Sequence, residues 1–200
     1  MTASMRPLDL GGADLRYDPR AWSRPEADAL FAKLRQEIPW EQHRLTLFGR
    51  EVAAPRLSCW IGDPDAVYTW SRTRFVPLPW TPTLAALRGK LENRLDARFN
   101  SVLANLYRDG RDAMGWHSDD EPELGSEPVI ASLSFGATRA FRLRSRSTRE
   151  AVLSLDLGHG SLLVMAGATQ RLYQHALPRR MRVRDARINL TFRWIRPVRA

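Results

Sequence analysis

The chain has 200 residues, 44% of them hydrophobic, and its seven Trp and seven Phe are enough to build the core of one domain. Its single cysteine, Cys59, excludes an intramolecular disulfide, a thiolate zinc site and an iron–sulfur cluster. A bound metal would therefore have to be held by histidine and carboxylate side chains.

The net charge of +9 comes from 31 basic against 22 acidic residues, and all but Lys33 and Lys90 among the basic residues are arginine. This excess favours a polyanionic partner, because arginine binds phosphate and releases its counterions. An arginine-rich, solvated surface explains the charge equally well. The chain has no run of about 18 apolar residues and does not begin like a secretory signal. We expect a cytoplasmic monomer that has no membrane partner.

The first half of the chain predicts two helices within loop-rich sequence. Residues 1–20 contain Gly, Pro and Asp without periodicity and are expected to form an irregular leader. Ser23 followed by Glu26 fits a capping box that begins a helix ending near Pro39. Residues 40–82 hold five prolines among short strand-like runs and are expected to be irregular. A second helix is predicted by leucines at helical spacing: Leu84, Leu87, Leu91 and Leu95.

After residue 98 the pattern changes to short runs rich in Val, Leu, Phe and Thr, separated by Gly, Asp or Ser. These runs are FNSVLANLY, VIASLSF, AFRLR, AVLSLDL, SLLVM and INLTFRWI. Many short strands without intervening helices predict an antiparallel barrel or jelly roll. We therefore expect a single, mainly β domain with flanking helices (α+β), whose core spans residues 98–200.

His117, Asp119 and His175 form an HxD…H set. Two imidazoles and one carboxylate can occupy one face of an octahedral iron(II) and leave the opposite positions open. Because residues two apart on an extended segment point to the same side, His117 and Asp119 can reach one ion. HxD alone is a weak signal, and His175 beside Pro178 also fits a structural histidine. A zinc enzyme or a jelly-roll isomerase could use the same ligand types.

Residues 187–194 alternate polar and apolar side chains, as in a strand with one polar face. Two arginines on that face, Arg187 and Arg193, would be costly inside a packed barrel unless an anion pairs with them. Their Cα atoms lie about 20 Å apart at roughly 3.3 Å per residue, so they can share a small ligand only by reaching toward each other. An exposed polar strand face is the alternative interpretation.

Several motifs together resemble, in their order, those of the AlkB family of iron(II)- and 2-oxoglutarate-dependent dioxygenases. They are NLYRDGRDAMGWHSDDE (residues 105–121), ASLSFGATRAF (131–141), HGSLLVMAG (159–167), the histidine at 175 and RINLTFR (187–193). The resemblance spans residues 45–195. It implies a double-stranded β-helix (jelly-roll) fold and oxidative removal of alkyl groups from DNA bases such as 1-methyladenine and 3-methylcytosine. It also implies iron(II) as the metal, with 2-oxoglutarate and dioxygen as co-substrates.

The resemblance assigns roles at the matching positions. His117, Asp119 and His175 would hold the iron. Arg187 would bind the distal carboxylate of 2-oxoglutarate, and Arg193 would lie near its metal-bound end. The remaining co-substrate contacts would come from neighbouring strand positions: Asn105, Tyr107 and Asn189.

The resemblance also points to contacts with nucleic acid. Glu121 would face the damaged base. The run GDPDAVYTWS resembles a lid segment, from which Tyr68 and Trp70 would stack on a flipped base. The segment LFGREVAAPR resembles a hairpin of members that repair duplex DNA, with Phe48 as a wedge in the base stack and Arg56 on the opposite strand or backbone.

Residues 21–97 would then form an N-terminal region of helices and a nucleotide-recognition lid. Each substrate contact has a structural alternative, such as a solvated acid, a core tryptophan or a buried strand phenylalanine. We expect demethylation of alkylated bases in DNA, preferably duplex DNA. The same chemistry on RNA or on a methylated protein side chain is one alternative, and a non-catalytic nucleic-acid-binding module is another. His43 has no predicted catalytic role, and His159 is predicted to lie in a turn.

Overall fold

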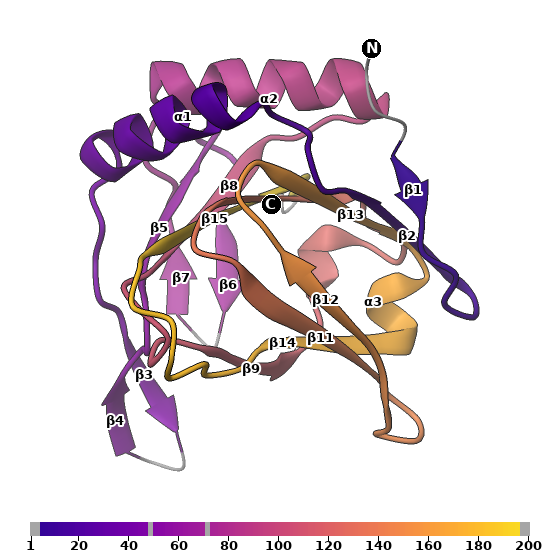
Figure 1. Ribbon diagram of the computed structural model, residues 1–200. Coiled ribbons are helices and arrows are strands. Elements are labelled where there is room, and N and C mark those ends of the chain that lie inside the picture. Colours follow the sequence, from indigo (N-terminus) through magenta and orange to yellow (C-terminus); the bar gives the residue numbers. More distant parts are fainter. Residues whose placement is uncertain (1–4, 48–49, 71–72, 197–200) are drawn as a thin grey trace.

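The computed structural model describes residues 5–47, 50–70 and 73–196, and these form two main antiparallel sheets, with the two long helices together on one side (Figure 1). The seven-stranded major sheet has the order β1 (Arg6–Pro7), β2 (Ala13–Asp18), β13 (Ser161–Gly167), β10 (Ile130–Gly136), β15 (Arg187–Arg193), β8 (Ser101–Tyr107) and β5 (Leu57–Gly62). The four-stranded minor sheet has the order β12 (Ala151–Leu157), β11 (Arg139–Ser145), β14 (Tyr173–Leu177) and β9 (Met114–His117).

The remaining elements are short hairpins and helices. The hairpins are β3 (Arg44–Leu47) with β4 (Arg50–Ala53), and β6 (Tyr68–Trp70) with β7 (Thr73–Phe75). The helices are α1 (Arg24–Glu37), α2 (Pro82–Leu95), the single-turn α3 (Thr169–Leu172) and the 3₁₀ turn η1 (Pro122–Leu124). The mainly β architecture with flanking helices is confirmed.

Both long helices begin after an N-capping residue, and the first of these caps is the one that the sequence predicts. The backbone N–H of Ser23 donates to Glu26 at 3.1 Å, and the Thr81 hydroxyl accepts from the Leu84 N–H at 3.3 Å. The helices pack side by side over the outer face of the major sheet (Figure 1). Their buried residues form one apolar core with that face, and this core also includes Cys59 of β5.

Strand β15 shows how the major sheet separates its two faces. Ile188, Leu190 and Phe192 are fully buried against the helices. The intervening polar residues point the other way, into the space between the sheets. The predicted alternation along this strand is therefore confirmed, and its polar face lies inside the protein.

The expected boundaries of the core are wrong at the N-terminal side. Strand β2, in the segment expected to be an irregular leader, pairs with β13 within the major sheet. Leu15 and Tyr17 of β2 are buried in a second apolar cluster, between the two sheets. Their period-two pattern covers only six residues, which is too short to stand out in a single sequence. Strand β5 also belongs to the major sheet, so the core does not begin at residue 98.

The loop-rich region 40–82 contains two hairpins as well as β5. Hairpin β3–β4 projects from the body of the domain (Figure 1). No helix among the described residues combines the length and apolar character needed to cross a bilayer.

Candidate metal centre

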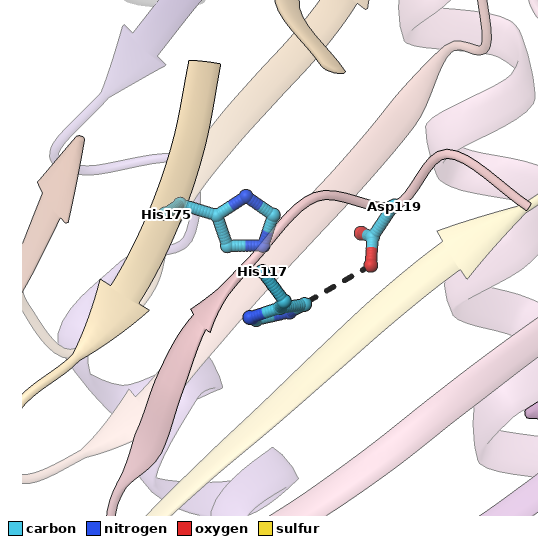
Figure 2. A group of neighbouring side chains, drawn as sticks. All are labelled: His117, Asp119 and His175. Atoms are coloured by element: carbon cyan, nitrogen blue, oxygen red, sulfur yellow. Dashed lines mark ion pairs between the residues drawn. The ribbon is translucent and has the colours of Figure 1, made fainter. Parts of the chain in front are cut away.

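The three predicted metal ligands converge between the sheets (Figure 2). His117 ends β9, Asp119 follows in the next loop, and His175 lies on β14, where antiparallel pairing sets it opposite His117. Ligand atoms of the three side chains all lie within 4.8 Å of one another, and the two imidazole centroids are 4.2 Å apart. One metal ion could therefore contact all three.

A hydrogen bond orients the first histidine. The Nδ1 atom of His117 is 2.9 Å from the Gly115 carbonyl, which can only accept, so Nδ1 carries the proton. The lone pair of Nε2 is then available on the side of Asp119, whose Oδ1 is 3.8 Å away. Such a contact fixes both the tautomer and the direction of a metal-binding imidazole.

Asp119 is 3% exposed and is held from two sides. Its N–H donates to the side chain of Gln170 at 2.9 Å, and its Oδ1 pairs with Arg193 at 2.9 Å. Burial alone would raise the pKa of Asp119, but Arg193 and the two histidines outweigh it, so the pKa lies below its usual value. The buried Oδ2 has no hydrogen-bond partner among the described residues, and its lone pairs are available to coordinate a metal cation.

His175 is kept neutral, which is the form that binds metal. Burial is the main reason that its pKa falls from 6.5 to about 3, and neighbouring His117 lowers it further. Two imidazoles beside an ionised carboxylate are the donor set that iron(II) oxygenases use, with positions left for other ligands. The residues present therefore fit a mononuclear iron(II) ion.

A cavity beside the ligands is lined by all five predicted co-substrate residues: Asn105, Tyr107, Arg187, Asn189 and Arg193. Arg187 is 2% exposed, and its Nη2 donates to Ser134 at 2.8 Å. Its Nε and Nη1 have no hydrogen-bond partner among the described residues. Burial lowers the pKa of Arg187 to about 10, so it remains a cation at neutral pH. A buried cation with two unpartnered N–H groups is a site for an anion.

Arg139, which the sequence did not single out, braces the loops beside this cavity. It is 1% exposed and donates to the carbonyls of Asp109, Asp112 and Pro178 at 3.0, 2.8 and 2.8 Å. Its guanidinium carbon lies 5.8 Å from the Tyr107 ring centroid, which Arg187 approaches at 5.3 Å. Tyr107 thus has cation–π contacts with two arginines.

The predicted nucleic-acid contacts are not gathered in this cavity. Glu121 lies half-buried just before η1 and is absent from the cavity lining. The described part of Tyr68 and Trp70 is their backbone in β6, and Phe48 lies outside the described residues.

Arg56, predicted to contact the opposite DNA strand or backbone, lies inside the protein. Arg56 is 4% exposed, and its Nε donates to Asn105 at 2.7 Å. The physical reason is that β5 joins the sheet beside β8, which places the residue just before β5 within reach of the cavity.

Sequence reasoning also missed Gln170, Ser132 and Ser134. The serines alternate with apolar residues in VIASLSF and face the polar positions of β15 in register, so strand pairing would have revealed them. Gln170 lies in the single-turn α3, where no periodic pattern marks it.

A jelly roll with a His, Asp, His set beside a buried arginine defines a mononuclear metal oxygenase that takes a small organic anion. The family described as the 2OG-Fe(II) oxygenase superfamily matches residues 14–193. The alpha-ketoglutarate-dependent dioxygenase alkB homolog 3 of Rattus norvegicus is 44% identical over 181 residues, which are 86% of this chain and 61% of the relative. The DNA oxidative demethylase ALKBH2 of Homo sapiens is 39% identical over 202 residues, covering 96% of this chain and 77% of the relative.

A solved structure of OsALKBH1 shares the fold, with a TM-score of 0.63 at 16% identity, and covers 96% of this chain and 100% of that one. The chain therefore belongs to the AlkB family within the 2OG-Fe(II) oxygenase superfamily. It spans 61% to 63% of the length of the mammalian alkB homolog 3 relatives. Family membership and the donor set together support iron(II), 2-oxoglutarate and dioxygen as cofactor and co-substrates.

Proposed function

We propose that the protein is an iron(II)- and 2-oxoglutarate-dependent dioxygenase that removes N-alkyl groups from damaged bases, with alkylated duplex DNA as its preferred substrate. One observation carries the proposal: a buried arginine with two unpartnered N–H groups lines the same cavity as three convergent metal ligands. Two of the similar proteins are named as an alpha-ketoglutarate-dependent dioxygenase and a DNA oxidative demethylase, which supports the same chemistry.

The side chains divide the work between holding the metal and holding the co-substrate. His117, Asp119 and His175 would bind iron(II), and Arg193 keeps Asp119 ionised and in place. Arg187 would bind the distal carboxylate of 2-oxoglutarate, which replaces its missing partners. When bound, iron with 2-oxoglutarate and dioxygen supplies the oxidation of an N-alkyl carbon, after which the alkyl group leaves as an aldehyde.

Apolar side chains line part of the cavity around the reacting groups. Leu103, Phe141, Met165 and Leu177 line the same cavity as the metal ligands. Where bound co-substrate displaces water from this cavity, the ionic contacts of Arg187 and Arg193 become stronger and reactive species are protected from side reactions. The chain itself therefore contributes positioning and shielding, while the bound groups supply the oxidation.

The nucleic-acid contacts belong to the same proposal. Glu121 would face a cationic lesion, Tyr68 and Trp70 would stack on the flipped base, and Phe48 would fill the gap in the duplex. The net charge of +9 supports a polyanionic substrate. We also propose that the protein works as a monomer, since one chain supplies both the metal ligands and the co-substrate arginine, and that it acts in the cytoplasm.

The test is an anaerobic titration with iron(II) and then 2-oxoglutarate, followed by oxygen and oligonucleotides that carry 1-methyladenine or 3-methylcytosine. We expect formaldehyde release, with faster turnover on duplex than on single-stranded DNA. Methylated RNA and a methylated peptide, run in parallel, separate the alternative substrates. Absence of metal-dependent succinate formation with every substrate would leave only a binding module.

The wedge has its own test. Phe48→Ala is expected to reduce repair of duplex DNA by about tenfold and to leave repair of single strands nearly unchanged, because only the duplex needs an unstacked gap filled. Initial rates of formaldehyde release on matched single-stranded and duplex oligonucleotides measure the difference. Equal losses on both substrates would refute the wedge role.

A further inference from the structure

Arg56 occupies a fixed position between the β3–β4 hairpin and the co-substrate cavity. Its N–H donates to the Ala54 carbonyl at 2.8 Å, and the Pro55 carbonyl accepts from the Ala113 N–H at 3.0 Å. The base of the hairpin is closed by a bond from the Ala54 N–H to His43 at 2.8 Å. The backbone at Arg56 is thereby tied both to the hairpin and to the segment that leads into β9.

The side chain of Arg56 reaches one particular atom of the cavity wall. Its Nε donates to Asn105 Oδ1 at 2.7 Å, and both side chains are buried, at 4% and 3% exposure. An amide side chain has two nearly equivalent orientations about its terminal bond. A guanidinium N–H can donate only to the amide oxygen, so this hydrogen bond selects one of the two orientations of the Asn105 amide. The NH2 group of Asn105 is then turned away from Arg56.

Asn105 lines the cavity beside Arg187 and the metal ligands. In the selected orientation it can offer a donor to a carboxylate or keto oxygen. The opposite orientation would present its carbonyl oxygen, which repels an anion. Arg56 also adds a buried positive charge on this side of the cavity, and like Arg187 it favours an anionic occupant.

We propose that Arg56 is a positioning residue for co-substrate binding: it holds the amide of Asn105 with its NH2 group toward 2-oxoglutarate. This inference rests on the proposed function and refines it, since Arg56 serves the keto diacid instead of the nucleic acid. A residue that acts through Asn105 should affect 2-oxoglutarate affinity, and the effect should disappear once Asn105 has been removed.

The experiment compares the wild-type protein with Arg56→Met, Arg56→Lys and the control Arg44→Met. Arg44 lies at the base of the same hairpin, with 68% of its side chain exposed. Each protein is loaded with manganese(II), which is not oxidised during the titration, and 2-oxoglutarate binding is measured by calorimetry. Binding of a methylated duplex oligonucleotide is measured separately by fluorescence anisotropy.

Arg56→Met is expected to raise the Kd for 2-oxoglutarate about tenfold, because the Asn105 amide can then turn its oxygen toward the anion. Arg56→Lys keeps the charge and one donor and should recover part of the affinity. Arg44→Met should bind 2-oxoglutarate like the wild type. Manganese affinity should be the same in all four proteins, which separates positioning from a general collapse of the site.

A double-mutant cycle with Asn105→Ala gives the sharpest result. If Arg56 acts through Asn105, adding Arg56→Met to Asn105→Ala should cost little further affinity. Fully additive losses, an unchanged 2-oxoglutarate Kd in Arg56→Met, or a loss confined to duplex binding would each overturn the inference while leaving the proposed function intact. A wild-type protein that binds no 2-oxoglutarate would overturn both.

Discussion

The two sheets contribute to the site in different ways. The major sheet supplies the groups that suit an organic anion, from the neighbouring central strands β8 and β15, and two helices pack on its outer face. The minor sheet supplies both histidines from β9 and β14, and its outer residues Trp116 and Val152 are 36% and 41% exposed. The anion site therefore lies on a sheet whose outer face is covered by helices. The two histidines of the metal site come from a sheet whose outer face is partly exposed.

This difference follows from how each ligand affects the stability of its own site. A buried guanidinium without its anion is costly, so the structure that carries Arg187 has to be stable by itself. A metal ion stabilises its own site when it binds, because its ligands gain strong bonds. Pairing of β14 with β9 even contains a register shift between His175 and Leu177. The co-substrate site therefore has to be stable before its ligand binds, whereas metal binding adds to the stability of the metal site.

The comparison predicts that a single substitution can abolish metal binding and leave the major sheet intact. Asp119→Asn should abolish iron binding, because it removes the ionised ligand of the set. Asp112→Asn should retain binding, since Asp112 pairs with Arg108 away from the ligands. Metal content after reconstitution and dialysis measures both. Iron retained by Asp119→Asn would contradict the ligand assignment.

Arg187→Met tests the co-substrate site of the major sheet. We expect the Kd for 2-oxoglutarate to rise about a hundredfold, since truncating a buried charged partner costs about 2–5 kcal/mol. Iron affinity should not change. Thermal stability should hold or rise, because the lost charge was only partly satisfied. Arg142→Met, an exposed arginine on β11, is the control, and an unchanged 2-oxoglutarate Kd in Arg187→Met would remove Arg187 from the site.

Gln170→Leu tests whether metal affinity depends on the residues that hold the ligands in place. Loss of the bond to the Asp119 N–H should lower metal affinity about tenfold, the smaller end of the effect of such supporting groups. Calorimetric titration with manganese(II) measures it, and Arg171→Gln, its exposed neighbour in α3, is the control. Equal affinity in both variants would mean that β9 alone positions Asp119.

Acidification should lower the stability of the metal-free protein, because His175 binds a proton more readily in the unfolded chain. Its pKa falls from 6.5 to about 3 on folding, so the unfolded chain binds more protons between these values. The free energy of unfolding should therefore decrease as the pH falls below 6.5, by at most about 1.4 kcal/mol per pH unit for one proton. Melting curves from pH 7 to 5 measure this slope. The slope should flatten in His175→Gln, and parallel curves would contradict it.

The sequence predicted what local patterns encode. Capping residues and leucine spacing located α1 and α2, and the alternation in residues 187–193 indicated the polar face of β15. The HxD spacing indicated that His117 and Asp119 could share one ion, and the structure brings both together with His175. These features depend on neighbours within a few residues in the chain.

Other features depend on pairing between distant segments. Arg56 lies at the cavity because β5 pairs with β8, and no local pattern reveals which strands become neighbours. Arg139 acts on three carbonyls from two separate loops, so its role exists only in the folded chain. Strand β2 was missed because two buried residues give too little periodicity.

Cys59 has a consequence for a protein that meets alkylating chemicals in its proposed work. Burial, aided by Glu41, raises the pKa of this thiol to about 11, and the side chain is 6% exposed within the apolar core. The thiolate, and not the thiol, attacks electrophiles. Little thiolate forms at neutral pH and the sulfur is buried, so both factors protect it. The agents that methylate bases should therefore leave the only thiol of the folded protein unmodified.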